Sequence, residues 1–446
     1  MQNKTVLIIG FTWPEPASTA AGNRMLQLLR YFKEREYRIV FTSTAVETTL
    51  SMDLEAMGIE KTQIKLNDSS FDEFLRNLRP NVVVFDRFLT EEQFGWRVDE
   101  FAPQALRVLD TEDLHSLRTT RQALLKKNIP FSVDAWLENE TTKREIASIY
   151  RCDVSLIISS YEMQLLTETL KINQGLLLYL PFMLENLDER SVKSWPSFES
   201  RKDFVCIGNG KHAPNIDAII WLKQEIWPLI RKALPDANLT IYGAYLPERI
   251  LQMDNTEEGF RVMGWAESAD QVLKKARVGL APLRFGAGIK GKLIDAMQAG
   301  TPTVTTSIGA EGMCSSASIM DILTGYANTK TKTWGSESAD GFDDKILDFP
   351  WNGLIADTAE DFADAAISLY QNEQEWTQAQ QNATPIINKL YDKRLLERKL
   401  DAAITAIQDK LKMHRTRNFI GAMLSHHTLT STKYMAKWIE AKNNGN

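Results

Sequence analysis

The stretch VGLAPLRFGAGIKGKLIDAMQAGTPTVTTS, residues 278–307, joins an apolar strand pattern, a glycine-rich turn and a helical pattern. Gly286, Gly288 and Gly291 have the spacing G-x-G-x-x-G, and Glu311 follows about twenty residues later. Such a loop typically binds a phosphate at the amino end of a helix, and the acidic residue also matches the dinucleotide-binding fingerprint. The stretch therefore predicts an α/β domain with a phosphate site, and leaves the identity of the ligand open.

Strand patterns of the same kind recur along the whole chain. Each is nearly continuous rather than alternating, which indicates parallel strands covered by helices on both faces. They lie at 6–11, 38–44, 81–86, 106–110, 154–160 and 176–182, and again at 204–210, 238–244, 261–266, 278–283, 302–307 and 352–357.

A polar segment, LENLDERSVKSWPSFESRKD at 184–203, separates the two series of strands and is interpreted as a linker. We expect two tandem Rossmann-like domains that face a central cleft, because ligands bind at the carboxyl ends of parallel strands. The predicted divisions are residues 1–187, residues 188–395, and C-terminal helices at 396–446. Residues 314–350 lack clear periodicity and are expected to be a surface insertion.

The composition is that of an ordinary globular protein, with 43% hydrophobic and 25% charged residues and a net charge of −6. The negative balance argues against a general nucleic-acid binder. The N-terminal apolar run is too short for a signal peptide, and the longest other run, 175–184, is about half a membrane span. Cys152, Cys206 and Cys314 lie far apart, which favours reduced thiols in the cytoplasm over disulfides or a zinc site.

The C-terminal segment 410–446 has a different charge balance, with seven Lys or Arg residues against the single acid Glu440. It begins with Lys410, Lys412, Arg415 and Arg417, after which apolar residues lie four apart. Two interpretations stay open. These helices either pack back on the protein, or also rest with their basic face on an anionic inner leaflet that holds a lipid-linked acceptor. The apolar pairs are Phe419 with Met423, Ile420 with Leu424, Tyr434 with Trp438, and Met435 with Ile439.

The residues around the glycines favour a ligand other than NAD. Lys290 and Lys292 flank Gly291 at the helix start, and Arg284 precedes the loop. Two cations suit a diphosphate that leaves during the reaction, because charge develops on it in the transition state. Asp295 in the same helix is suited to accept hydrogen bonds from the vicinal hydroxyls of a ribose. A dinucleotide fingerprint would also usually stand in the first βαβ unit of its domain.

Three segments resemble those of GT-B glycosyltransferases of the family 4 type: APLRFGAGIKGKLIDAMQAGTPTVTT, IGNGKHAPNIDAIIWLKQEIWPLI with PDANLTIYGA, and LDTEDLHSLR at 109–118. The resemblance covers nearly the whole chain. It implies a retaining, metal-independent transferase that uses a nucleotide sugar and no further cofactor. It implies that Lys290 and Lys292 bind the diphosphate and that Asp295 binds the ribose. Ala287 stands where the family has the first Glu of its E-x7-E pattern.

Further candidate residues come from the strand ends and the resemblance. His115, in the segment that resembles the family's histidine-bearing loop, is expected to contact a sugar. Gly309 and Glu311 are candidates for sugar or phosphate binding. Gly22, which permits a close approach at the start of the first helix, and Arg24, which is expected to meet a phosphate, are predicted on the acceptor side of the cleft. Lys211, beside His212 and Asn215, is a candidate phosphate contact, whereas the His426–His427 pair lacks the further ligands of a metal site.

The sequence thus predicts a glycosyltransferase of polysaccharide biosynthesis that acts on a glycan or lipid-linked glycan. Two alternatives stay open. One is an NAD-dependent enzyme or a nucleotide-sugar epimerase on a similar scaffold, and the other is a non-catalytic GT-B partner subunit, which the Ala287 departure favours.

Overall fold

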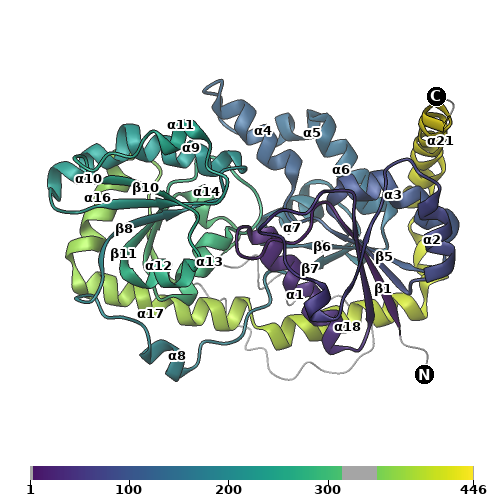
Figure 1. The fold of residues 1–446 in the computed structure, drawn as a ribbon, viewed down its shortest axis with the longest axis horizontal. Helices are drawn as coiled ribbons and strands as arrows, with labels where there is room; N and C mark the ends of the chain where they lie inside the picture. The colour runs from purple at the N-terminus through teal and green to yellow at the C-terminus, as the bar shows by residue number, and fades with distance from the viewer. Residues whose placement is uncertain (1–3, 314–348, 445–446) are drawn as a thin grey trace.

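The computed structural model describes residues 4–313 and 349–444. Figure 1 shows two domains side by side, each with a central parallel sheet. The first sheet has the strand order β3-β2-β1-β4-β5-β6-β7. Its strands are β1 (Thr5–Gly10), β2 (Arg38–Ser43), β3 (Glu60–Gln63), β4 (Val82–Asp86), β5 (Leu106–Asp110), β6 (Val154–Ile157) and β7 (Leu177–Tyr179). Its helices are α1 (Ala20–Glu34), α2 (Ser70–Leu78), α3 (Arg87–Phe101), α4 (His115–Leu125), α5 (Val133–Glu138), α6 (Glu140–Arg151) and α7 (Ser160–Gln164).

The second sheet has six parallel strands in the order β10-β9-β8-β11-β12-β13. They are β8 (Lys202–Ile207), β9 (Leu239–Tyr242), β10 (Phe260–Gly264), β11 (Ala276–Ala281), β12 (Thr303–Thr305) and β13 (Gly353–Ile355). The helices are α8 (Glu189–Lys193) in the linker, then α9 (Ala213–Trp221), α10 (Trp227–Ala233), α11 (Glu248–Leu251), α12 (Ala269–Lys275), α13 (Gly291–Gln298), α14 (Ser307–Ala310) and α16 (Ala359–Gln371).

The predicted fold class is confirmed, because both sheets are parallel and helices connect their strands. All twelve predicted strands exist, with ends that differ by a few residues. The sequence reading missed β3, a polar edge strand whose residues are exposed or half-buried and therefore lack an apolar run.

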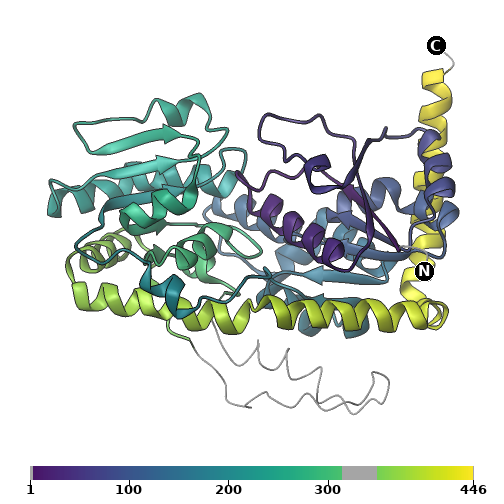
Figure 2. The ribbon, with the colours of Figure 1, turned by 60° about the horizontal axis from the view of Figure 1, so that its bottom comes forward.

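The end of the chain returns from the second domain to the first. Helix α17 (Glu373–Leu390) packs on the second domain, and α18 (Lys393–Asp409) then crosses over, as Figure 2 shows beneath both domains. Leu396, Leu400 and Ile404 of α18 lie in the same hydrophobic core as β1 and α1. The predicted start of the C-terminal helices at residue 396 therefore falls within α18.

Helices α19 (Leu411–Arg417), α20 (Phe419–Leu424) and α21 (Thr430–Asn444) complete the described chain. No helix in the described ranges is long and apolar enough to cross a membrane. Cys152 and Cys206 are buried free thiols. Cys314 and all but the last two residues of the predicted insertion lie outside the described residues.

Candidate active site

The glycine loop of the second domain touches the first domain at the carboxyl ends of the two sheets. Gly288 has a φ of +64°, and a Cβ built there would lie 2.9 Å from the Cβ of Asp113. Its amide donates a hydrogen bond to Glu162 Oε1 at 2.8 Å. A side chain at residue 288 would be strained and would push the two domains apart, which explains the glycine.

The positions of the other two glycines also lie in contact with the first domain. A Cβ at Gly291 would lie 2.6 Å from that of Ala20, so the amino end of α13 sits directly against α1. The Gly286 carbonyl accepts a hydrogen bond from Arg121 Nη1 at 2.8 Å. These contacts bring the G-x-G-x-x-G loop to the interface between the domains, as the sequence predicts.

Lys290 and Lys292 stand at the amino end of α13 without a carboxylate at ion-pair distance among the described residues. Lys290 Nζ donates to the Gly288 carbonyl at 3.0 Å, and Lys292 Nζ donates to Asn215 Oδ1 at 2.7 Å. Burial lowers the pKa of Lys290 to about 8 and also lowers the pKa of Lys292. An ammonium group has three N–H donors, so each lysine retains capacity to bind an anion.

Asp295 lies one turn further along α13 and is half-buried. Burial, with the nearby charge of Asp270 on α12, raises its pKa to about 7. Asp295 lines a cavity of about 300 Å³ between α1 and α13. The other lining residues are Ala20, Asn23, Gln27, Arg30, Phe182, Met183, Leu184, Glu185, Gly291, Ile294, Gln298, Lys393 and Glu397.

His115 begins α4 on the first domain's side of the cleft. Its Nε2 lies 3.4 Å from Asp113 Oδ1 and its Nδ1 lies 3.7 Å from Glu145 Oε1. Burial lowers its pKa to about 4, so the imidazole is neutral at pH 7. Glu145 accepts hydrogen bonds from the amides of His115 and Ser116, at 2.7 and 2.9 Å, and so fixes the first turn of α4.

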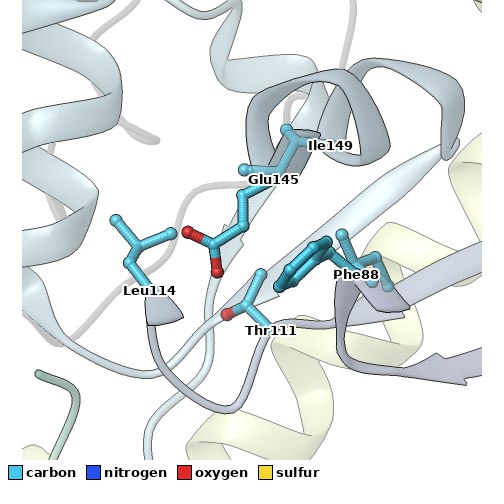
Figure 3. Close-up of a pocket in the computed structure, with 6 residues that line it drawn as sticks. Phe88, Thr111, Leu114, Glu145 and Ile149 are labelled. Carbon is cyan, nitrogen blue, oxygen red and sulfur yellow. The ribbon is translucent and has the colours of Figure 1, made fainter. Parts of the chain in front are cut away.

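Figure 3 shows Glu145 reaching from α6 toward the β5–α4 loop, with its carboxylate between Leu114 and Thr111. Burial raises the pKa of Glu145 to about 8. Its buried carboxyl group is therefore placed to position His115 rather than to carry a free charge.

A histidine from each domain lies near the same ion pair. Arg118 Nε donates to Asp113 Oδ2 at 2.8 Å. Burial opposes the ionisation of Asp113, but the charge of Arg118 outweighs it and lowers the carboxyl pKa. His212, at the amino end of α9, has its pKa lowered to about 4 by burial and by Arg118. The imidazoles of His115 and His212 are thus both neutral at pH 7, and the charges of Asp113 and Arg118 act on the pKa of each.

Several predicted residues have other partners in this structure. Arg24 is buried: its Nε lies 2.8 Å from Asp110 Oδ1, and its Nη1 donates to the Leu180 carbonyl at 2.7 Å. This position differs from the predicted phosphate contact. Gly22 allows α1 to approach the backbone of Glu15, 2.4 Å from a built Cβ.

On the second domain, Arg284 is bound to Asp217 by hydrogen bonds of 2.9 and 2.6 Å. Lys211 lies over the Tyr245 ring, 3.5 Å from its centroid. The Gly309 amide donates to Thr306 Oγ1 at 3.0 Å and is therefore already engaged. Their predicted ligand contacts stay predictions.

Glu311, the acidic residue of the fingerprint, is bound from the opposite domain. Arg121 on α4 reaches its two carboxylate oxygens at 2.8 and 2.7 Å. Sequence reasoning missed Arg121, Glu145 and Glu162, because each lies within a helical pattern where charged residues are common. No spacing in the sequence distinguishes them.

Residues 201–324 match the family model "Glycosyl transferases group 1". The two-domain fold is the GT-B fold of the similar solved structures, and the match to the glycosyltransferase family model covers less than a third of the chain. Within residues 4–313 and 349–444, no three His, Cys, Asp or Glu side chains are grouped so that they could hold a metal ion.

Similar solved structures include sucrose-phosphate synthase from Thermosynechococcus elongatus, with 13% identity and a TM-score of 0.60 over 90% of this chain and 98% of that one. Anabaena Alr3699/HepE in complex with UDP and glucose has 10% identity and a TM-score of 0.60 over 90% and 100%. WaaG, a glycosyltransferase involved in lipopolysaccharide biosynthesis, has 11% identity and a TM-score of 0.55 over 90% and 99%.

Among curated proteins, a 44.6 kDa protein in the cps region of Klebsiella pneumoniae is 30% identical over 113 residues. That match covers 24% of this chain and 29% of the relative. The chain likewise covers 58% of the Staphylococcus aureus TarM chain that it resembles with a TM-score of 0.51.

Proposed function

We propose that this protein transfers a sugar from a nucleoside diphosphate to a hydroxyl acceptor, with retention at the anomeric carbon and without a metal ion. The observation that carries the proposal is the pair of lysines at the amino end of α13. They have neutral acceptors, Gly288 O and Asn215 Oδ1, and no paired carboxylate among the described residues. A diphosphate bound there would supply the missing negative charge and gain from the helix dipole.

A nucleotide sugar as the donor is supported by the similar structures, of which Alr3699/HepE was solved with UDP-glucose. In our proposal Asp295 holds the ribose hydroxyls and the two lysines hold the diphosphate. The sugar itself is not specified, because Ala287 lacks the carboxylate that the resemblance would place there.

The proposed reaction needs no protein nucleophile. The bond from the anomeric carbon to the phosphate oxygen breaks while the acceptor oxygen bonds to the same face of that carbon. The acceptor proton passes to the leaving phosphate, and Lys290 and Lys292 stabilise the charge that develops. His115, neutral and fixed by Glu145, would hydrogen-bond a sugar. Contact between the domains would exclude water from the reacting atoms.

The acceptor is proposed to be a glycan or lipid-linked glycan of polysaccharide biosynthesis, for which the likeness to WaaG is the support. Cys152 and Cys206, buried and unpaired, are compatible with a reducing cytoplasm. Peripheral contact with the inner leaflet is part of the same proposal.

A non-catalytic partner subunit is the second candidate. It is favoured by Ala287, which packs against the core of the first domain instead of presenting a carboxylate to the cleft. Such a subunit would bind a nucleotide without turning over a nucleotide sugar.

The test is a thermal-shift screen with UDP-, GDP- and dTDP-sugars and with NADH, followed by measurement of nucleoside diphosphate release. We expect one nucleotide class to stabilise the protein and its sugar to be slowly hydrolysed. Stabilisation without release would favour the partner subunit. Conversion of the sugar without release would indicate an epimerase, and stabilisation by NADH alone would indicate an oxidoreductase.

A further inference from the structure

The C-terminal helix carries its largest apolar side chains toward solvent. Helix α20, a π-helical turn at Ser425–Leu429 and α21 follow one another at the edge of the first domain (Figure 1, yellow). Phe419 is 74% exposed, Tyr434 is 66% exposed and Trp438 is 60% exposed. Met423 and Met435 are exposed as well. These five residues are called the outer face below.

On the opposite side of this helix, two small residues allow close packing on the first domain. A Cβ at Gly421 would lie 2.1 Å from the Tyr150 carbonyl, so α20 packs closely on α6. Ala436 is buried against Trp96 of α3. A helix that only packs on a globular domain places its large apolar residues inward. Here the large apolar residues of the outer face point away from the domain. The helix therefore has an apolar face that the described part of the chain does not cover.

In the segment 410–446 the acidic side chain faces the domain, whereas most basic side chains are exposed. Its single acid, Glu440, points inward: Oε1 accepts from the Ser69 amide at 2.8 Å. Two basic residues are also used internally, Arg415 with Asp153 at 2.7 Å and Lys433 with Glu100 at 2.6 Å. The basic residues that are exposed are Lys410, Lys412, Arg417, Lys437 and Lys442.

We propose that the outer face inserts into the interfacial region of an anionic lipid bilayer. Tyr and Trp favour that region because each has an apolar body and a polar tip. Exposed lysines beside them match the negative charge of the lipid headgroups. The sequence predicted an electrostatic contact through Lys410, Lys412, Arg415 and Arg417. In the structure Arg415 is bound to Asp153 and is therefore not part of that contact. The proposed contact includes the apolar outer face instead.

The experiment is flotation of the full chain with vesicles of neutral phosphatidylcholine alone and with added phosphatidylglycerol, at low and high salt. We expect binding to the anionic vesicles and at least tenfold weaker binding to the neutral ones. The double variant Phe419→Ser/Trp438→Ser should lose at least tenfold in partitioning. Leu229→Ser/Leu251→Ser, at two exposed leucines of the second domain, is the matched control and should bind like the wild type.

A second pair of variants separates charge from insertion. Lys437→Gln/Lys442→Gln should weaken binding at low salt by about fivefold per charge. Lys126→Gln/Lys127→Gln, at exposed lysines of the turn that follows α4, should not. Brominated acyl chains should quench wild-type tryptophan fluorescence more than that of Trp438→Phe, since the indole must reach the acyl boundary.

Two results would overturn the proposal. One is recovery of the wild-type chain in the unbound fraction with every vesicle. The other is concentration-dependent dimerisation that Phe419→Ser/Trp438→Ser abolishes while no vesicle binds, which would show that a second copy covers the outer face. None of these readouts uses turnover, so failure here is distinguishable from failure of the proposed activity.

Discussion

Buried cationic side chains have different kinds of partner in the two domains. In the first domain, Arg24 is paired with Asp110, and the guanidinium lies 2.8 Å from the nearer carboxylate oxygen. Arg121 is paired with Glu311 of the second domain, with Nη1 and Nη2 each donating to one carboxylate oxygen. In the second domain, Lys290 and Lys292 are held by one carbonyl and one amide oxygen.

Burial alone does not explain this difference. Arg201 is also buried without a carboxylate, but four backbone carbonyls and Thr301 Oγ1 surround its guanidinium. The two lysines have one such acceptor each. A buried charge that lacks a counter-charge or enough hydrogen-bond acceptors costs free energy of folding. Such a charge is tolerated where a bound ligand supplies the missing partner. The arginines are therefore compensated within the protein, whereas each lysine keeps N–H donors that the proposed diphosphate would use.

The largest expected effect is on stability, at Arg24. Arg24→Met leaves Asp110 buried without its partner, and we expect the free energy of unfolding to fall by about 3–5 kcal/mol. Urea unfolding measures it, and Arg24→Met/Asp110→Asn should recover part of the loss. Arg30→Met, at an exposed position of the same helix, is the control. A small stability change together with lost nucleotide binding would restore the predicted phosphate role of Arg24.

The next effect is on catalysis, at Lys290. Lys290→Ala should raise the activation barrier by about 3 kcal/mol, or two orders of magnitude in turnover. Unlike Arg24→Met, it should leave the stability of the unliganded protein nearly unchanged, because no ion pair is broken. Lys275→Ala, at the exposed end of α12, is the matched control. Wild-type turnover in a folded, donor-saturated Lys290→Ala protein would contradict the assignment.

The same difference separates what could be predicted from the sequence from what could not. The parallel sheets and the glycine loop were predictable, because continuous apolar runs and G-x-G-x-x-G spacing are local patterns. Lys290 and Lys292 became candidates for the same reason, because they stand next to that loop. The partners of a charged residue are not local: Arg24 and Asp110 lie 86 positions apart, and Arg121 and Glu311 lie 190 apart.

Consequently, the sequence could not show that Arg24 is buried and paired with Asp110, and it missed Arg121 and Glu162 although they join the domains. The position of α18 was unpredictable in the same way. Its apolar pattern shows that it is amphipathic, but not that Leu396 and Leu400 fill the core of the domain at the other end of the chain.

Glu162 gives an effect that depends on pH. Burial raises its pKa from 4.5 to about 7, while its Oε1 accepts the amides of Leu114 and Gly288. A raised folded-state pKa contributes stability that is fully present below pH 4.5 and is lost as pH rises through 7. Glu162→Gln keeps an acceptor and cannot ionise.

We therefore expect Glu162→Gln to match the wild type in acid and to be more stable by about 3 kcal/mol in urea unfolding at pH above 8. Buried Glu112 and Glu145, whose pKa values are raised to about 8, titrate in both proteins, so the difference isolates Glu162. The exposed Glu168→Gln is the control. Equal pH dependence in wild type and Glu162→Gln would show that Glu162 ionises freely.

The smallest expected effect is that of a chelator. If Lys290, Lys292 and the amino end of α13 neutralise the leaving diphosphate, they supply the charge that a divalent cation would otherwise provide. Turnover of the wild-type chain in excess EDTA should then equal turnover without it, and added Mg²⁺ or Mn²⁺ should change nothing. Lys290→Ala measured in the same series shows the size of the effect when one of these charges is missing. Loss of wild-type activity in EDTA, restored by either metal, would mean that the lysines do not suffice and that the contrast with the paired arginines has another cause.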